Sequence, residues 1–265
     1  MATAKVHHIQ IHYEVYGTGF PLIMIMGLGG NIQWWDPRMI QALSPQFRMV
    51  LFDNRGTGQS ETSDSEYTIT LFADDVAGLM DALQIPKAHV LGISMGGMIA
   101  QELVLYHPEK VDKLILCSTY CGGSQSIPPS LDTLGMITGD RTNMSPEEIT
   151  RRTLPAIFTK EFLDENPELA EIAIQQMMNE PTSEEILMHQ MNAIMAFGTF
   201  DRLTQVSTPT LILHGKKDIL LPPGNADILA QVIQNSRLVY FENSAHNLSE
   251  EMEEVISVIT SFLAK

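Results

Sequence analysis

The sequence predicts an α/β fold, with a mostly parallel central sheet flanked by helices and one inserted all-helical segment. Short, continuous apolar runs of strand length recur along the chain, which is typical of parallel strands that are covered on both faces. Helical patterns lie between these runs, and such alternation favours a parallel sheet. The alternation stops once, because residues 123–204 contain no strand-like run between two strand candidates.

The totals describe a globular chain of 265 residues, long enough for one large domain with an insertion. Apolar residues make up 44% and charged residues 18%, which argues against wholesale disorder. A net charge of −16 would be repelled by phosphate backbones, so we expect no nucleic-acid partner. These totals leave a homo-oligomer open.

Three features indicate a cytoplasmic protein. The first residues form no apolar signal segment, and no uninterrupted apolar run reaches the length of a membrane span. Only two cysteines occur, and Cys117 lies inside an apolar run, where a reduced thiol fills a core. We therefore expect no membrane span and a reducing compartment.

The strand candidates are of two kinds. Residues 6–16, "VHHIQIHYEVY", alternate between polar and apolar side chains, so we expect one half-exposed strand there. Six continuous apolar runs predict buried strands. They are "PLIMIM" (21–26), "FRMVLFD" (47–53), "AHVLGI" (88–93), "KLILCS" (113–118), "TLILHG" (210–215) and "RLVYFE" (237–242).

Helices are expected between these runs. Residues 70–85 carry apolar side chains at helical spacing, and Thr70 is the expected N-cap. Further helical patterns occupy residues 94–108, which Pro108 ends, and also residues 224–234 and 249–265.

The insertion reads as helical throughout. Its helical patterns are "SPEEITRRTLPAIF", "NPELAEIAIQQMMN" and "TSEEILMHQMNAIMAF". We therefore expect a core of residues 1–122 and 205–265 and a helical cap of residues 123–204. Such a cap would cover one end of the sheet as a lid.

A serine between glycines marks the candidate nucleophile. Gly92-Ile93-Ser94-Met95-Gly96 lies where a strand run meets a helical pattern. The G-x-S-x-G spacing alone is weak evidence, but the strand–turn–helix context is typical of a nucleophilic serine on a sharp turn. The alternative is a site where small residues allow a helix to pack closely.

A serine hydroxyl needs a base, and the base needs a carboxylate. His246 follows the last strand run, at the sheet edge where Ser94 is expected. Of the other seven histidines, His214 also ends a strand, but beside Gly215 we expect a packed turn residue. Asp218 follows a strand, so the predicted triad is Ser94, Asp218 and His246. The backbone N–H groups of Leu28 and Met95 are the predicted oxyanion hole, with Leu28 in the glycine-rich residues 27–30.

These motifs resemble the α/β-hydrolase fold superfamily over nearly the whole chain. The likeness is carried by "YGTGFPLIMIMGLGG", "VLFDNRGTGQS", "HVLGISMGGMIAQEL", "TPTLILHGKKDILLP" and "SAHNLSEE", and by the chain order of the triad. It is greatest to small bacterial carboxylesterases, enol-lactonases and cofactor-free haloperoxidases. Such proteins usually carry His-Gly where this chain has Met26-Gly27. Arg55 resembles the superfamily's structural arginine, without a catalytic role.

The resemblance implies a serine hydrolase that forms an acyl-enzyme on Ser94 and needs no metal or organic cofactor. A small, largely apolar ester or lactone is the expected substrate. A C–C bond hydrolase, a haloperoxidase-like perhydrolase and a non-catalytic ligand receptor remain as alternatives, although C–C hydrolases often carry asparagine where Ile93 stands. Four apolar side chains are candidates for substrate contact, or else they pack the cap: Trp34, Trp35, Met136 and Met191. We find no metal-binding motif in the sequence.

Overall fold

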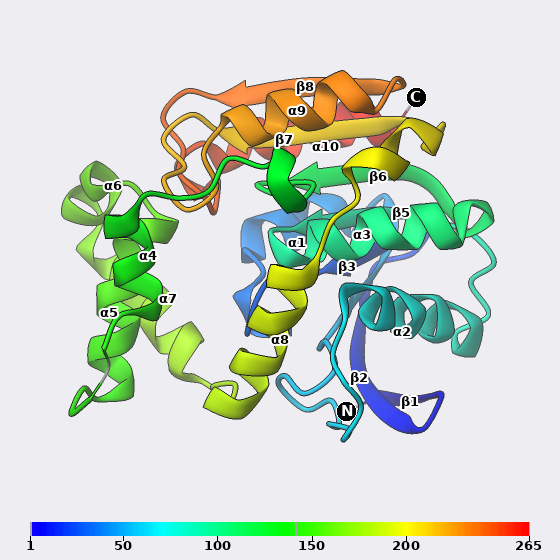
Figure 1. Cartoon of the computed structure of the whole chain (residues 1–265). Helices are drawn as coiled ribbons and strands as arrows, with labels where there is room; N and C mark the ends of the chain where they lie inside the picture. Colours follow the sequence, from blue (N-terminus) through cyan, green and yellow to red (C-terminus); the bar gives the residue numbers. More distant parts are fainter. Residues whose placement is uncertain (1, 141, 265) are drawn as a thin grey trace.

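The computed structural model describes residues 2–140 and 142–264 and contains one eight-stranded sheet (Figure 1). The strand order is β1-β2-β4-β3-β5-β6-β7-β8. All pairings from β4 to β8 are parallel, whereas β1–β2 and β2–β4 are antiparallel. The strands are β1 Ala2–Val6, β2 Ile9–Tyr16, β3 Phe20–Ile25, β4 Phe47–Phe52, β5 Ala88–Ile93, β6 Val111–Cys117, β7 Thr210–Gly215 and β8 Ser236–Phe241.

Helices cover both faces of this sheet. Helices α2, α3 and α9 pack with one buried cluster, and α1 and α10 pack with another. Their bounds are α1 Pro37–Leu43, α2 Ile69–Ala82, α3 Met95–Tyr106, α9 Gly224–Val232 and α10 Met252–Leu263. The predicted α/β fold with a mostly parallel sheet between helices is therefore confirmed.

Strand β3 shows why the buried strands read as continuous apolar runs. Ile23 and Ile25 face the α2–α3–α9 layer, whereas Leu22 and Met24 face the α1–α10 layer. Because successive side chains of a strand point to opposite faces, a strand covered on both sides needs an apolar residue at every position.

The regular structure of the insertion, as far as the structure describes it, is helical. The longer elements are α4 Leu131–Thr138, α5 Pro146–Ile157, α6 Lys160–Glu165, α7 Pro167–Met178 and α8 Glu184–Ala196. The two ends of the insertion lie side by side where it joins the rest of the chain. There Gly123 N–H donates to Phe197 O (3.1 Å), and Thr199 N–H donates to Cys121 O (2.8 Å). Figure 1 shows α4–α7 grouped beside the core, with α8 leading back to it.

Two local predictions were wrong. The single strand expected over residues 6–16 is split by a turn at His7, whose φ is 51°, and β1 pairs antiparallel with β2. β1 is short and buries only Ala4 and Val6, so its sequence gave no clear signal for a strand. The N-cap of α2 is Thr68 and not Thr70, because the helix starts at Ile69 and the Thr68 hydroxyl accepts the Leu71 N–H at 3.0 Å.

A buried histidine in β5 makes stability depend on pH. His89 lies 4.6 Å from the ring of Phe20 and 5.9 Å from that of Phe47. Burial lowers the pKa of His89 from 6.5 to about 4, although the Asp112 carboxylate, 3.3 Å away, opposes the shift. As pH falls from 6.5 to about 4, the unfolded chain binds a proton before the folded chain does. Acid in this range therefore lowers the free energy of unfolding.

We expect His89→Phe to flatten this part of the pH dependence, because phenylalanine has no group to protonate. Urea unfolding at several pH values between 4 and 7.5 would measure the change. His8→Phe is the matched control, because His8 is an exposed histidine in the turn between β1 and β2. An unchanged slope in His89→Phe would contradict the prediction.

Candidate active site

Ser94 occupies a strained turn between β5 and α3. Its φ of 57° and ψ of −121° lie in a region that non-glycine residues rarely adopt. Its N–H donates to Cys117 O (2.9 Å), and the Thr119 hydroxyl donates to Ser94 O (2.8 Å). These bonds hold the turn in a single conformation.

The glycines of the motif allow a close approach of chains. A Cβ at Gly92 would lie 2.2 Å from the Gly96 carbonyl oxygen, and one at Gly96 would lie 2.0 Å from the Ile25 oxygen. No side chain fits at either distance. The spacing therefore presses β5, β3 and the start of α3 together and leaves the Ser94 side chain at the end of the strand.

The loop of residues 27–30, which we call the oxyanion loop, runs beside Ser94. A Cβ at Gly27 would lie 3.1 Å from Ser94 Cβ and 3.6 Å from Ser94 Oγ. Leu28, one of the two predicted donors, follows directly. Met95, the other, is the first residue of α3, so its N–H has no acceptor within the helix.

Asp218 and His246 form a buried pair. His246 Nδ1 lies 2.8 Å from Asp218 Oδ2, and the two residues are 6% and 2% exposed. The other carboxylate oxygen accepts the N–H groups of Leu220 (2.9 Å) and Leu221 (2.8 Å). The acid is thus fixed by its own loop and directed at the imidazole.

His214 is a buried neighbour of the Asp218 carboxylate. It is fully buried, its Nε2 lies 3.3 Å from Asp218 Oδ2, and Nε2 is 2.8 Å from the Leu221 carbonyl oxygen. It is a packed residue, as the sequence suggested, but it also contacts the acid.

The protonation of the pair suits a base. Burial opposes ionisation of Asp218, but the His246 and His214 side chains outweigh it and hold the pKa of Asp218 below its usual range. With Nδ1–H of His246 donating to this carboxylate, Nε2 keeps the lone pair that a base needs. Ser94, Asp218 and His246 follow β5, β7 and β8, so all three lie at the carboxyl edge of the parallel strands.

The insertion is bonded to the oxyanion loop, which the sequence did not indicate. Gly29 N–H donates to Gln190 Oε1 (2.8 Å), and the Thr182 hydroxyl donates to Gly29 O (2.8 Å). Gln190 lies on α8 and is fully buried, and its Nε2 has no hydrogen-bond partner among the described residues. Gln190 lies 161 positions from Gly29. In the sequence it is a single polar residue within a helical pattern, so nothing there predicts this contact.

The remaining sequence candidates lie in different surroundings. Trp35 is buried and Trp34 partly buried in the cluster beneath α1 and α10. Met136 and Met191 are half-buried on α4 and α8. Arg55 is fully buried and bound to Asp75 at 2.6 and 2.8 Å, which fits a structural role.

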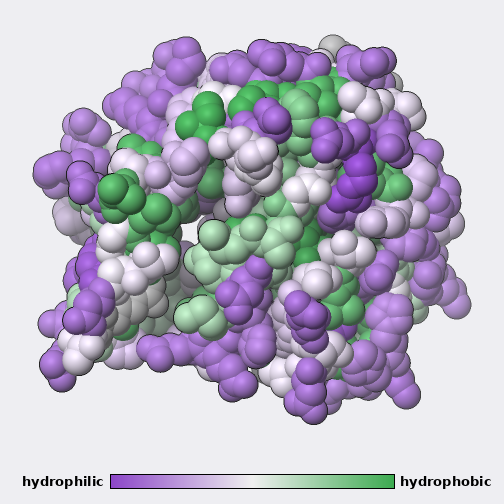
Figure 2. All heavy atoms as spheres, viewed as in Figure 1, coloured by the Kyte–Doolittle hydropathy of each residue, from purple (hydrophilic) through white to green (hydrophobic). Residues whose placement is uncertain are grey.

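Apolar side chains border a hollow beside the insertion. Figure 2 shows a hollow between the insertion and the rest of the molecule, with apolar side chains on both sides of it. Helices α4 and α8 expose four large apolar residues, namely Leu131, Leu134, Met188 and Met195. Within residues 2–140 and 142–264, no cluster of three or more His, Cys, Asp or Glu could hold a metal ion, and no helix could span a membrane.

Comparison with known proteins agrees with this geometry. The protein assigned as carbamate hydrolase RutD in Azorhizobium caulinodans is 28% identical, covering 94% of this chain and 92% of that protein. The protein assigned as non-heme bromoperoxidase BpoC in Mycobacterium tuberculosis is 27% identical, covering 97% and 98%. The enol-lactonase structure from Burkholderia xenovorans LB400 has a TM-score of 0.86 and 25% identity over the full length of both chains. The sequence signature of the alpha/beta hydrolase fold matches residues 21–252, and the chain therefore belongs to the α/β-hydrolase fold family.

Proposed function

We propose that this protein is a serine hydrolase that cleaves small, largely apolar carboxylic esters or lactones through an acyl-enzyme on Ser94. The observation that carries the proposal is the buried His246–Asp218 pair (2.8 Å) at the same sheet edge as the strained Ser94 turn. Few structural roles require a buried, ionised acid to orient a histidine at the sheet edge that also carries a serine on such a turn.

The proposed reaction runs in two stages on these residues. Ser94 Oγ attacks the carbonyl carbon while His246 Nε2 takes the hydroxyl proton, and Asp218 stabilises the resulting imidazolium. The N–H groups of Leu28 and Met95 donate to the oxyanion. When this tetrahedral intermediate collapses, the alcohol leaves and receives its proton from His246. Water, activated by the same imidazole, then releases the acid.

Exposed apolar side chains of the insertion support the proposed substrate class. The apolar side chains of α4 and α8 suit an apolar acyl or alkyl group, and flexible methionines fit irregular shapes. The similarity to an enol-lactonase supports a lactone, and the similarity to RutD supports a carbamate as a related acyl substrate. The similarity to BpoC keeps a perhydrolase reaction as the second candidate.

A substrate panel tests this proposal. Purified protein would be given p-nitrophenyl esters of increasing acyl length, γ- and δ-lactones, an alkyl carbamate, and acetate with hydrogen peroxide. We expect steady turnover of esters or lactones and labelling by an alkyl phosphonate. Labelling without turnover of any member would instead support a ligand receptor.

We expect turnover to survive the removal of metal ions. Ser94, His246 and the two backbone donors supply nucleophile, base and charge stabilisation without a metal or an organic cofactor. Dialysis against a chelator should leave kcat unchanged. A loss that a divalent ion restores would contradict the prediction.

We further propose that the insertion is a lid that positions the oxyanion loop. The Gly29 N–H bond to Gln190 fixes the Leu28–Gly29 peptide, which adjoins the Gly27–Leu28 peptide that carries the Leu28 N–H. Gly29 sits at φ +68°, which glycine adopts freely, and its carbonyl oxygen also accepts the hydroxyl of Thr182 from the insertion. The lid thus contributes to the reaction through the loop.

Gln190→Leu should lower kcat/KM by about 10- to 100-fold, because losing a buried acceptor costs about 1–3 kcal/mol. Gln190→Glu, which keeps an oxygen for Gly29 N–H, should stay within about tenfold of wild type. Steady-state kinetics on a short ester, with thermal unfolding, would measure both. Gln175→Leu, on the exposed side of α7, is the matched control. Unchanged kinetics in Gln190→Leu would contradict the positioning role.

A further inference from the structure

A cavity of about 590 Å³ lies apart from the triad. Its walls come from β2, from residues 31–41 beyond the oxyanion loop, from the loop after β4 and from Glu180 of the insertion. None of the three triad candidates, Ser94, Asp218 and His246, lines this cavity. Its volume is within the range of small-molecule sites.

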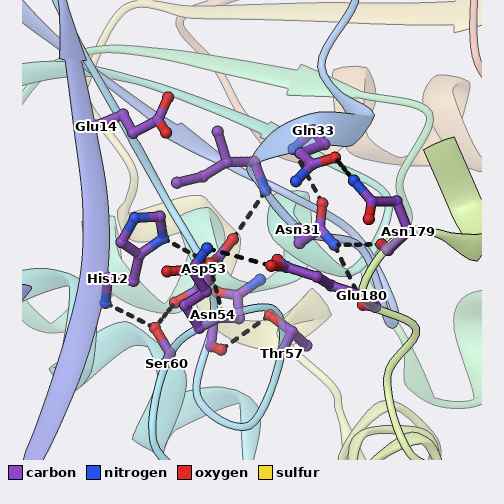
Figure 3. Close-up of polar contacts among 12 residues, drawn as sticks. His12, Glu14, Asn31, Gln33, Asp53, Asn54, Thr57, Ser60, Asn179 and Glu180 are labelled. Atoms are coloured by element: carbon purple, nitrogen blue, oxygen red, sulfur yellow. Dashed lines mark hydrogen bonds and ion pairs between the residues drawn. The ribbon is translucent and has the colours of Figure 1, made fainter. Parts of the chain in front are cut away.

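A second histidine–aspartate pair forms the floor of this cavity. His12 Nδ1 lies 2.8 Å from Asp53 Oδ2, and both residues are buried (Figure 3). Asp53 also accepts the N–H groups of Ile32 (2.8 Å) and Gln59 (2.9 Å). An aspartate surrounded by donors acts as the acceptor, so His12 Nδ1 carries the hydrogen.

The other ring nitrogen of His12 is left without a partner. Nε2 is buried and makes no hydrogen bond to any described residue. His12 as a whole is 4% exposed, and it is one of the residues that line the cavity. In the neutral ring Nε2 presents a lone pair. Buried polar atoms are normally paired, so this nitrogen points to a ligand that donates a hydrogen.

The acidic side chains that line the cavity make it negatively charged. The carboxylates of Glu14 and Glu180 line it with Asp53, and none of the residues that line it is lysine or arginine. Glu14 accepts the Tyr16 hydroxyl and Glu180 accepts Gln59 Nε2 at 3.2 Å, which leaves acceptor capacity on both. The polar groups that remain free on His12, Glu14 and Glu180 are therefore acceptors.

The walls also offer apolar and aromatic surface. Ile32 and Ile40 contribute aliphatic side chains, and Tyr16 and Trp35 contribute rings over which a cation is attracted. Figure 3 shows Glu14, Gln33 and Glu180 around the floor formed by His12 and Asp53. An apolar body can lie along these walls while its charged end meets the acceptors.

From this arrangement we infer that the cavity binds a small organic cation with N–H donors and an apolar body, such as a protonated amine or an amidinium. The cation's N–H groups donate to His12 Nε2 and to the carboxylates of Glu14 and Glu180. An anion would meet three carboxylates there and no positive side chain. The site is separate from the proposed hydrolytic reaction.

Benzamidine is a suitable probe, because it joins an amidinium to an aromatic ring. Trp34 and Trp35 are the only tryptophans of the chain, and Trp35 lines the cavity, so intrinsic fluorescence reports binding directly. We expect a saturable change with a Kd of about 1 mM or lower. Benzyltrimethylammonium, which has no N–H, should bind at least about tenfold more weakly, and benzoate and benzyl alcohol should not bind.

Charge-removing variants locate the site. Glu14→Gln with Glu180→Gln should weaken benzamidine binding at least about tenfold, because the amidinium loses both carboxylates. Glu184→Gln with Glu185→Gln removes the same two charges from exposed positions of α8 and should leave the Kd unchanged, as should Ser94→Ala. The single variants replace the double one if it does not fold.

Three results would overturn the inference. They are no saturable change up to about 10 mM benzamidine, equal binding of benzoate, or loss of binding once Ser94 carries a phosphonate label. The last would place the probe at the triad.

Discussion

Ser94→Ala is expected to lower kcat for p-nitrophenyl esters by about 10⁵-fold or more and to abolish phosphonate labelling. Removing the serine of a comparable triad costs about 10⁶-fold in kcat, because the histidine and the acid have no nucleophile to activate. The two oxyanion donors remain, so a small residual rate is consistent with the mechanism. Burst kinetics and mass spectrometry of the labelled protein would measure both effects. Persistent labelling of Ser94→Ala would remove Ser94 from the mechanism.

A second substitution at the same residue separates chemistry from strain. Alanine at φ 57° has the same backbone strain as serine, whereas glycine adopts this conformation freely. Both variants should be inactive, but Ser94→Gly should be more stable than Ser94→Ala by about 1 kcal/mol, measured by urea unfolding. Equal stabilities would show that the turn stores no strain.

The parts of the fold that could be predicted from the sequence are those with local, repeated signals. Residues such as Ile23 and Leu22 face two different helix layers, so every position of β3 is apolar and the strand is evident in the sequence. The candidate site could be predicted because Ser94, Asp218 and His246 each follow a strand run, and parallel strands bring their carboxyl ends to one edge.

What the sequence could not indicate depends on distant contacts. The bond between Gly29 and Gln190 joins positions 161 residues apart, and neither residue shows a pattern of its own. The unpartnered His12 Nε2 is visible only once β2 lies beside the loop after β4. The turn at His7 was missed for a local reason, because it contains no glycine or proline and interrupts the polar–apolar alternation only by the pair His7–His8.

Asp218→Asn is expected to lower kcat by about four orders of magnitude, or roughly 5 kcal/mol of barrier. The asparagine oxygen should take the place of Oδ1, which accepts the N–H groups of Leu220 and Leu221. Its amide nitrogen then faces His246 Nδ1 and donates to it. The imidazole is held in the tautomer that carries its hydrogen on Nε2, so it cannot accept the Ser94 proton.

The same substitution should change stability in a defined pH range. The pKa of Asp218 is lowered in the folded protein, so its ionised form stabilises the fold above the unfolded-state pKa, near 3.9, and this contribution is lost as pH falls towards the folded-state pKa. The difference in unfolding free energy between wild type and Asp218→Asn should therefore be largest at neutral pH and shrink below about pH 4.

The loss of activity in Asp218→Asn should ease as pH rises, because hydroxide can partly replace the disabled base. Ser94→Ala gives the background rate, and Glu242→Gln is the matched control. Glu242 follows β8 close to His246, but it is 71% exposed at its side chain and pairs with Lys216 at 3.1 Å, so its loss should leave kcat within about twofold of wild type. If Asp218→Asn stayed within about tenfold of wild type while Glu242→Gln lost activity, the roles of the two acids would be reversed. The buried, doubly braced Asp218 carboxylate favours the first outcome, because only a fixed acid can hold one imidazole tautomer through the whole reaction.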